Sequence, residues 1–163
     1  MSNIKNLITK KKHIFIIAEI GINHNGSIKT AKKLIDYAKD ADADAVKFQT
    51  YDVNNLVSSN TKVANYQKKS GEKNQYKLLK KYQLSYNNFK SIKDYCDKKK
   101  ILFLSTPFDN ESAIFLNKLG VSLFKVSSAD LKNLHLLTKI KSFKKKIILS
   151  TGMSNFFDLY KTL

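Results

Sequence analysis

Arginine is absent from this chain of 163 residues, and cysteine and proline occur only once each. The single cysteine, Cys96, excludes an internal disulfide and a cysteine-ligated zinc site, and it fits a reducing compartment. No apolar run approaches the ~20 residues that a membrane-spanning helix needs. Residues 1–12 are basic but lack the apolar region of a signal peptide. We therefore expect a cytoplasmic protein with no membrane segment.

Acidic residues are also scarce, with 13 against 30 lysines, so the formal net charge is +17. Clustered cations bind nucleic-acid phosphates by releasing counterions. Here the lysines are spread from Lys5 to Lys161, and arginine, the better reader of bases and phosphates, is missing. This pattern favours a solvated lysine surface and no nucleic-acid partner, with a lysine-rich nucleic-acid binder as the alternative.

Five short apolar runs predict β-strands, and a hydrophobic content of 42% indicates a folded chain. Each run is continuous rather than alternating, which is typical of parallel strands that are covered on both faces. The intervals between them carry apolar residues at helical spacing. We predict strands over residues 14–18, 43–48, 101–104, 123–126 and 147–149, and helices around residues 31–38, 89–96, 114–119 and 134–140.

The interval from Tyr51 to Gln83 differs from the others because it is long and polar. Only residues 76–82 within it show a short helix-like pattern. Long connections inside compact folds are usually functional or mobile. We therefore expect this interval to be either functional or mobile.

Repeated strand-helix units fit either an open doubly wound sheet or a barrel. A dinucleotide-binding fold would need a Gly-x-Gly-x-x-Gly after the first strand, and none is present. Ser150-Thr151-Gly152 begins a further loop, and residues 155–163 resemble an unfinished helix. A (β/α)8 TIM barrel typically has ~250 residues. We expect residues 1–163 to be a partial barrel domain of about five units, an N-terminal portion with two unpaired strand edges.

Polar residues lie at or just after the carboxyl ends of all five predicted strands, where a barrel would bring them to one rim. They are Glu19, Lys47, Gln49, Ser105, Thr106, Lys125, Ser127, Ser128, Asp130, Ser150 and Thr151. Lys47 and Lys125 have apolar neighbours, so both should be partly buried and need an anion. That anion is either a ligand phosphate or carboxylate, or a protein carboxylate such as Glu19 or Asp130.

The first strand leads into a loop, residues 18–26, that holds a carboxylate, two amides and an imidazole beside two glycines. Ordinary turn chemistry also explains this composition. Neither His13 nor His135 has a partner at metal-site spacing, so we predict no metal ligands in this chain.

Five motifs in order carry a resemblance to a known family. They are Ala18 to Gly26, Val46-Lys47-Phe48-Gln49-Thr50, Ser105-Thr106-Pro107-Phe108, Phe124-Lys125-Val126-Ser127-Ser128 and Leu149-Ser150-Thr151-Gly152-Met153. Together they resemble the sialic acid synthase (N-acetylneuraminate synthase) family. That resemblance implies a (β/α)8 barrel followed by an antifreeze-like domain. It also implies condensation of phosphoenolpyruvate with N-acetylmannosamine or a related amino sugar, which gives a nonulosonic acid and phosphate.

The resemblance also implies residue roles. Glu19 would sit beside a divalent metal and act in proton transfer, and Asp130 stands where many members have Glu and would orient the sugar. The groups that would hold phosphoenolpyruvate are Lys47, Thr106, Lys125, Ser128 and Ser150, and those that would contact the sugar or substrate are Gln49 and Asn23.

Several features of the family would lie beyond this chain. Two histidines on later strands bind Mn2+ or Mg2+, and the second domain completes the partner's site in a homodimer. We therefore expect the chain to be inactive by itself. Legionaminic or pseudaminic acid synthase is the nearest alternative function, and a phosphoenolpyruvate-binding module is the alternative that is not an enzyme.

Overall fold

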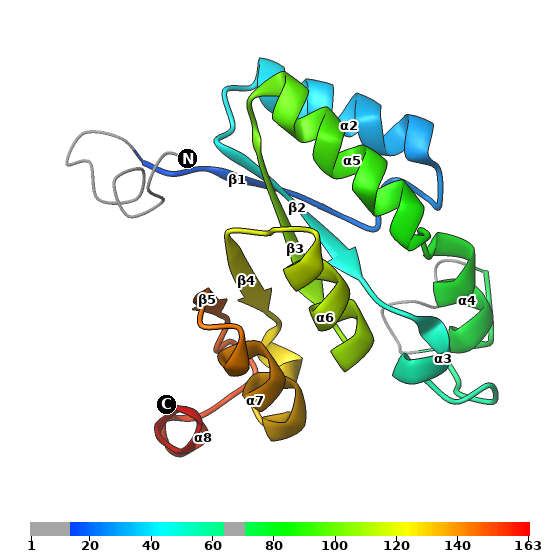
Figure 1. Cartoon of the computed structure of the whole chain (residues 1–163). Helices are drawn as coiled ribbons and strands as arrows, with labels where there is room; N and C mark the ends of the chain where they lie inside the picture. Colours follow the sequence, from blue (N-terminus) through cyan, green and yellow to red (C-terminus); the bar gives the residue numbers. More distant parts are fainter. Residues whose placement is uncertain (1–13, 64–70) are drawn as a thin grey trace.

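The computed structural model describes residues 14–63 and 71–163 and shows alternating strands and helices (Figure 1). Residues 1–12 and His13, which entered the predictions above, lie outside the described residues. In chain order the elements are β1 (Ile17–Gly21), α2 (Ile28–Asp40), β2 (Ala45–Thr50), α3 (Val53–Leu56), α4 (Gln75–Tyr82), α5 (Tyr86–Lys99), β3 (Leu102–Pro107), α6 (Asn110–Lys118), β4 (Leu123–Val126), the 3-10 turn η2 (Ser128–Asp130), α7 (Leu134–Ser142), β5 (Lys146–Leu149) and α8 (Phe156–Thr162).

All strand pairs in the described residues are parallel, as predicted. β2 lies between β1 and β3, β4 pairs with β5, and β3 runs beside β4. Helices α2 and α5 lie side by side against the first three strands, and α6 packs against α7 (Figure 1). The fold is therefore an α/β arrangement of successive strand-helix units.

Three predicted strand positions are wrong by two or three residues. β1 begins at Ile17 rather than residue 14, since the exposed Ile14 and Ile16 lie before it. β2 and β3 continue through Thr50 and Pro107, past their apolar runs. Backbone hydrogen bonds hold a strand whatever its side chains are, so the ladder extends through polar residues. β4 has the predicted bounds, and β5 begins one residue early.

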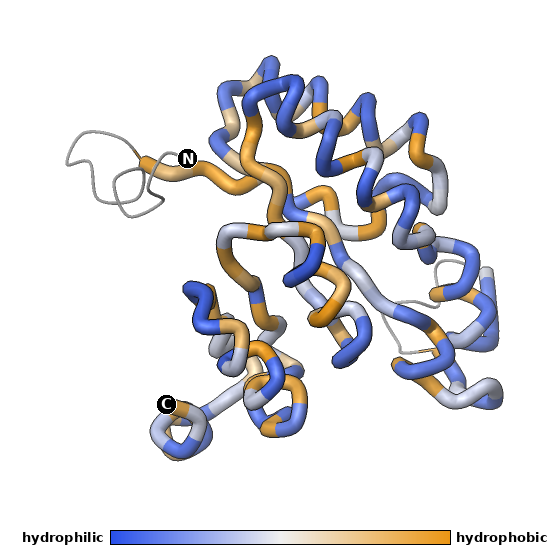
Figure 2. Tube along the Cα trace, in the orientation of Figure 1, coloured by the Kyte–Doolittle hydropathy of each residue, from blue (hydrophilic) through white to orange (hydrophobic). Residues whose placement is uncertain are grey.

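The sheet has two faces because successive side chains of a strand point in opposite directions. One face packs against the helices, and its core includes Val46, Phe48 and Phe103. The opposite, inner face carries Ala45 and Leu104 in a smaller cluster. Figure 2 shows the apolar residues concentrated along the strands, with polar residues on the outer sides of the helices. No helix in the described residues is both long and apolar enough to cross a membrane.

The long interval after β2 folds back over the end of the sheet. The helix predicted over residues 76–82 is present as α4, whereas the short helix α3 was not expected. The Tyr51 hydroxyl donates to the Leu79 carbonyl at 2.9 Å, and the Val53 N–H donates to Gln83 Oε1 at 3.0 Å. These contacts fix the interval against the strand that precedes it.

His24 is built into the first loop as a buried, neutral side chain. It is 1% exposed, and its ring stacks on Phe48 with centroids 6.0 Å apart. Nδ1 accepts from the Gly26 N–H at 3.1 Å, and Nε2 has no partner among the described residues. Burial lowers the pKa of His24 from 6.5 to about 4. This histidine therefore stabilises the turn in its neutral form.

Gly26→Ala should destabilise the fold more than Gly120→Ala. Both glycines have positive φ, which costs an alanine ~1–2 kcal/mol. At Gly26 the new Cβ would also lie 2.4 Å from the Lys81 carbonyl oxygen, whereas at Gly120 it would meet no atom within 4 Å. We expect the urea midpoint to fall further for Gly26→Ala at an unchanged m value. Equal midpoints for the two variants would contradict the close approach at Gly26.

His24 should also make stability depend on pH. The unfolded chain takes up this proton near pH 6.5 and the folded chain only near pH 4, so stability is lost as pH falls through this window. His24→Asn keeps an acceptor for the Gly26 N–H but cannot be protonated. Between pH 7 and 4 the natural protein should lose about 3 kcal/mol more than His24→Asn. Exposed His135→Asn is the control, and urea unfolding that gives His24→Asn the natural loss would refute the assignment.

Candidate active site

Glu19, Lys47 and Thr106 come together on the inner face near the carboxyl ends of the first three strands. Glu19 is the register partner of Lys47 across β1 and β2, so both side chains leave the sheet on the same side. The Lys47 ammonium forms an ion pair with Glu19 Oε2 and lies 3.5 Å from Thr106 Oγ1. The Lys47 side chain is 12% exposed and that of Glu19 is 54% exposed. The structure thus places a protein carboxylate beside Lys47, one of the two alternatives that the sequence left open.

Lys125 forms no ion pair with a carboxylate among the residues that the structure describes. Its ammonium donates to the Val126 carbonyl at 2.8 Å and to Ser150 Oγ, both of which are neutral acceptors. Burial lowers the pKa of Lys125, the positive charge of Lys47 lowers it further, and Glu19 partly opposes the shift. The interpretation that Asp130 pairs with Lys125 is not supported, because neither contact of Lys125 involves it.

This cluster carries an excess of positive charge. The positive charge of Lys47 acts on Lys125, and Glu19 is the carboxylate that opposes it. Partly buried charges are costly unless they are paired. An anion bound between Lys47 and Lys125 would supply the missing charge, and the Thr106 and Ser150 hydroxyls lie beside it as donors.

Strand alternation separates two hydroxyls that the sequence grouped together. Ser105 pairs in register with Phe48 of the helix-facing core, and its Oγ lies 2.7 Å from Thr50 Oγ1. Thr106 pairs with Gln49, which faces the other way. Ser105 therefore does not join Thr106 on the inner face, although both follow the same apolar run.

The remaining predicted residues lie in the turns that follow β1 and β4. Ser128 and Asp130 belong to η2, which directly follows the strand of Lys125. Asp130 Oδ1 accepts from Asn133 Nδ2 at 3.3 Å, while Oδ2 is buried without a hydrogen bond among the described residues. Burial raises the pKa of Asp130. Asn23 is exposed in the first loop.

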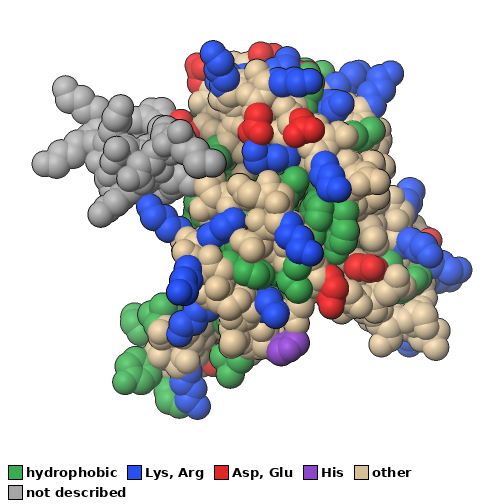
Figure 3. Space-filling model, in the orientation of Figure 1, with side chains coloured by type: hydrophobic (Ala, Val, Ile, Leu, Met, Phe, Trp, Pro, Cys, Tyr) green, Lys and Arg blue, Asp and Glu red, His purple; other side chains and the backbone are tan. Residues whose placement is uncertain are grey.

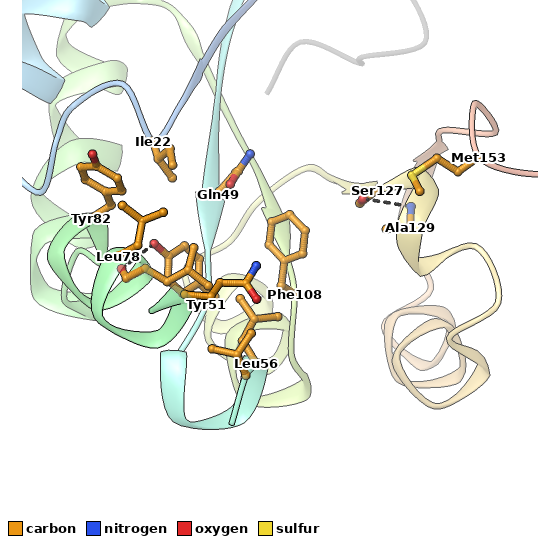
Figure 4. A pocket seen from close by; sticks show the side chains of 13 residues that line it. Ile22, Gln49, Tyr51, Leu56, Leu78, Tyr82, Phe108, Ser127, Ala129 and Met153 are labelled. Atoms are coloured by element: carbon orange, nitrogen blue, oxygen red, sulfur yellow. Dashed lines mark hydrogen bonds between the residues drawn. The ribbon is translucent and has the colours of Figure 1, made fainter. Parts of the chain in front are cut away.

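A cleft of about 620 Å3, which the sequence did not predict, adjoins Gln49. Figure 4 shows most of its wall on one side, formed by Ile22, Tyr51, Leu56, Leu78, Tyr82 and Phe108. Ser127, Ala129 and Met153 lie opposite. The aromatic residues inside and beside the long polar interval are the sequence feature from which the cleft could have been predicted. They come together only because α3 and α4 fold over the end of the sheet.

No three His, Cys, Asp or Glu side chains converge in a metal-binding arrangement within residues 14–63 and 71–163. These residues therefore do not by themselves fit a divalent cation, and the expected Mn2+ or Mg2+ stays a prediction. The lysines on the face seen in Figure 3 are dispersed over many elements and form no single basic patch there.

Comparison with known proteins identifies a family. Residues 34–163 match the NeuB family. The chain is 44% identical over 154 residues to N,N'-diacetyllegionaminic acid synthase of Campylobacter jejuni, which covers 93% of this chain and 46% of that protein. It is 34% identical over 161 residues to pseudaminic acid synthase of the same organism, covering 97% of this chain and 46% of that protein.

A solved structure gives the same result. The crystal structure of N-acetylneuraminic acid synthetase from Leptospira borgpetersenii, in complex with citrate, superposes with a TM-score of 0.79 and 33% identity. The match covers 91% of this chain and 48% of that one. The chain thus spans about half the length of the relatives it matches. Since the family match extends over most of its residues, the chain belongs to the NeuB family, whose members are sialic acid synthase-like enzymes.

Proposed function

We propose that this chain forms the phosphoenolpyruvate-binding part of a nonulosonic acid synthase. The enzyme would condense phosphoenolpyruvate with N-acetylmannosamine or a related N-acetylated amino sugar and release phosphate. The observation that carries this proposal is the pair Lys47 and Lys125, two partly buried cations of which only Lys47 forms an ion pair among the described residues. Phosphoenolpyruvate bears both a phosphate and a carboxylate, so it can neutralise both ammonium groups at once. The citrate bound by the Leptospira relative shows that this relative takes up a compact polyanion.

The residues of this chain would mainly hold and orient the reactants. Lys47, Lys125, Thr106 and Ser150 would fix the two anionic groups of phosphoenolpyruvate, with Ser128 nearby on η2. Holding C3 of the enol against the aldehyde carbon of the open-chain sugar converts a bimolecular step into an effectively unimolecular one. The new C3–C bond forms from the enol electron pair as the aldehyde C=O opens to a hydroxyl, water adds at C2, and phosphate leaves with the C2–O bond electrons. The two protons of the water pass to the former aldehyde oxygen and to the phosphate, which leaves a ketone at C2.

Four further side chains would act on the sugar and on protons. Glu19 is more than half exposed although paired with Lys47, so its second oxygen can exchange a proton with a reactant. Asp130, with one buried oxygen unpaired among the described residues, would orient a sugar hydroxyl from η2. Gln49 and Asn23 would add amide contacts to substrate.

We also propose that the chain is the N-terminal part of a TIM barrel, a single partial domain of a longer cytoplasmic enzyme. The parallel order of the strands and the coverage of about half of each relative support this. The metal ligands, the antifreeze-like domain and the homodimer contact would then belong to segments beyond these 163 residues. By itself the chain would be inactive.

Two sugar substrates are candidates. N-acetylmannosamine would give N-acetylneuraminate, and a diacetamido sugar would give N,N'-diacetyllegionaminic acid. The identity of 44% to the legionaminic enzyme of C. jejuni, against 34% to its pseudaminic enzyme, favours the legionaminic over the pseudaminic alternative.

Replacing either site lysine should abolish synthesis in the complete enzyme. Lys47→Ala or Lys125→Ala removes a charge that contacts a multiply charged substrate, and we expect kcat/KM for phosphoenolpyruvate to fall at least about 100-fold. Lys146→Ala is the matched control because Lys146 is exposed at the other end of neighbouring β5. The measurement is phosphate release from phosphoenolpyruvate, with and without the amino sugar.

Three results would count against the proposal. Phosphate release that does not require the amino sugar would exclude the condensation. Rates near the natural level in both lysine variants would refute the assigned roles. Turnover by the 163-residue chain alone would contradict its expected inactivity.

Anion binding by the chain should weaken at alkaline pH. The pKa of Lys125 is lowered by burial and by Lys47, so this lysine loses its proton at lower pH than an exposed lysine does. The protonated form binds the anion, and therefore affinity falls as pH rises through the lowered pKa. Calorimetry with sulfate, whose charge is constant between pH 7 and 10, measures the effect. Lys125→Met should bind weakly and lack this pH dependence, and a flat profile for the natural protein would contradict the assignment.

A further inference from the structure

Lys125 has the surroundings of a reactive amine rather than those of a surface lysine. Its side chain is half-buried near the carboxyl end of β4, and its ammonium donates to the Val126 carbonyl at 2.8 Å and to Ser150 Oγ. Burial and the positive charge of Lys47 lower its pKa, so its neutral amine forms at lower pH than that of an exposed lysine. A lysine that is desolvated or lies next to another cationic group is an activated nucleophile toward carbonyl compounds.

An apolar layer lies beside this amine. Leu123 precedes Lys125 by two residues, on the same face of β4, and it forms the inner cluster with Ala45 and Leu104. Ile148, the register partner of Lys125 on β5, packs against the same cluster. Exclusion of water protects reactive intermediates from hydrolysis. These neighbours therefore favour a covalent adduct of Lys125 that water would otherwise break down.

Lys47 supplies a group that can hold a carboxylate in the same cluster. An ammonium has three N–H donors, and the described contacts of Lys47 with Glu19 and Thr106 use two of them. A 2-oxo acid has its ketone on the carbon next to its carboxylate. A carboxylate bound at Lys47 would therefore bring the ketone toward the Lys125 amine. The nonulosonic acid that the proposed reaction forms is itself a 2-oxo acid.

Lys145 shows what burial provides without the second cation. Its ammonium donates to the Val121 carbonyl at 2.8 Å, and burial lowers its pKa as well. Burial is the cause of that shift, whereas at Lys125 the charge of Lys47 contributes too. Lys145 is therefore an internal control for reactivity that depends only on a partly buried amine.

We propose that Lys125 is a covalent modification site for 2-oxo acids, whose ketone forms a reversible imine with its amine while Lys47 holds the carboxylate. This inference rests on the proposed function only in that the cluster takes up a carboxylate. The lone pair of the neutral amine attacks the ketone carbon, the C=O bond breaks as C=N forms, and both amine hydrogens leave with the oxygen as water. No oxidant or reductant is consumed. The imine occupies the cluster, so a 2-oxo acid would compete with phosphoenolpyruvate.

Reductive trapping of pyruvate on the 163-residue chain tests the site. Cyanoborohydride reduces an imine of pyruvate to a stable carboxyethyl-lysine, which peptide mass spectrometry locates. We expect the label at Lys125, with little at Lys145 or at the exposed Lys146, and its loss in Lys125→Arg. Because the natural protein is mapped directly, the result does not depend on the folding of a variant. Equal label on the three lysines, or none on Lys125, would overturn the proposal.

Methyl pyruvate separates recognition of the carboxylate from reactivity of the amine. It carries the same ketone without the negative charge, so Lys47 cannot hold it through a charge-assisted hydrogen bond. We expect pyruvate to label Lys125 faster than methyl pyruvate does. Lys47→Met should slow the labelling by pyruvate, and the control Lys146→Met, at an exposed lysine of β5, should leave it unchanged. Labelling by pyruvate at the natural rate in Lys47→Met would overturn the role of Lys47.

Competition with phosphoenolpyruvate distinguishes this inference from the proposed function. Calorimetry measures phosphoenolpyruvate binding by itself, and bound phosphoenolpyruvate should protect Lys125 from pyruvate. Selective label at Lys125 in a chain that does not bind phosphoenolpyruvate would refute the proposed function and support the imine. Phosphoenolpyruvate binding without label at Lys125 would refute the imine and leave the proposed function supported. Binding that gives no protection would overturn the competition.

Discussion

The repulsion between Lys47 and Lys125 is the constraint on which the inner face of the sheet depends. Two ammonium groups lie on the inner face beside a layer of apolar side chains, and Glu19 is paired with Lys47. A fold that only needed stability would place apolar residues there, because replacing buried ion pairs by hydrocarbon is often neutral or favourable. The arrangement is therefore better explained by binding than by packing. An anion is the component that would complete it.

Strand alternation makes this arrangement possible at low cost to the rest of the fold. The same strands that carry Lys47 and Thr106 inward present Phe48 and Phe103 to the helices, where the main core is built. Because the polar residues occupy only the carboxyl ends of the inner face, Ala45 and Leu104 still form a small apolar cluster beneath them. Stability and chemistry are thus assigned to different faces of one sheet.

The sequence predicted that the strands are parallel, since continuous apolar runs flanked by helical patterns have few other solutions. For β4 it also predicted both bounds correctly. It placed β1 too early because Ile14 and Ile16 are apolar but exposed, and hydropathy cannot distinguish a run inside a sheet from one beside it. Which carboxylate forms the ion pair with Lys47 could be decided only from the structure. It depends on the register between β1 and β2, which no local pattern specifies.

The length of the interval between β2 and α5 indicated a functional or mobile segment, but the sequence did not predict that this interval forms the wall of a cleft. Its polarity suggested a loop, yet its buried residues, Tyr51 and Val53 with Leu79, form an apolar cluster of their own. That cluster exists only because α3 and α4 fold back against each other and onto the end of β2. A separate small core gives the wall rigidity that a mobile loop would lack, so the apolar surface beside Gln49 is held in place before any ligand arrives.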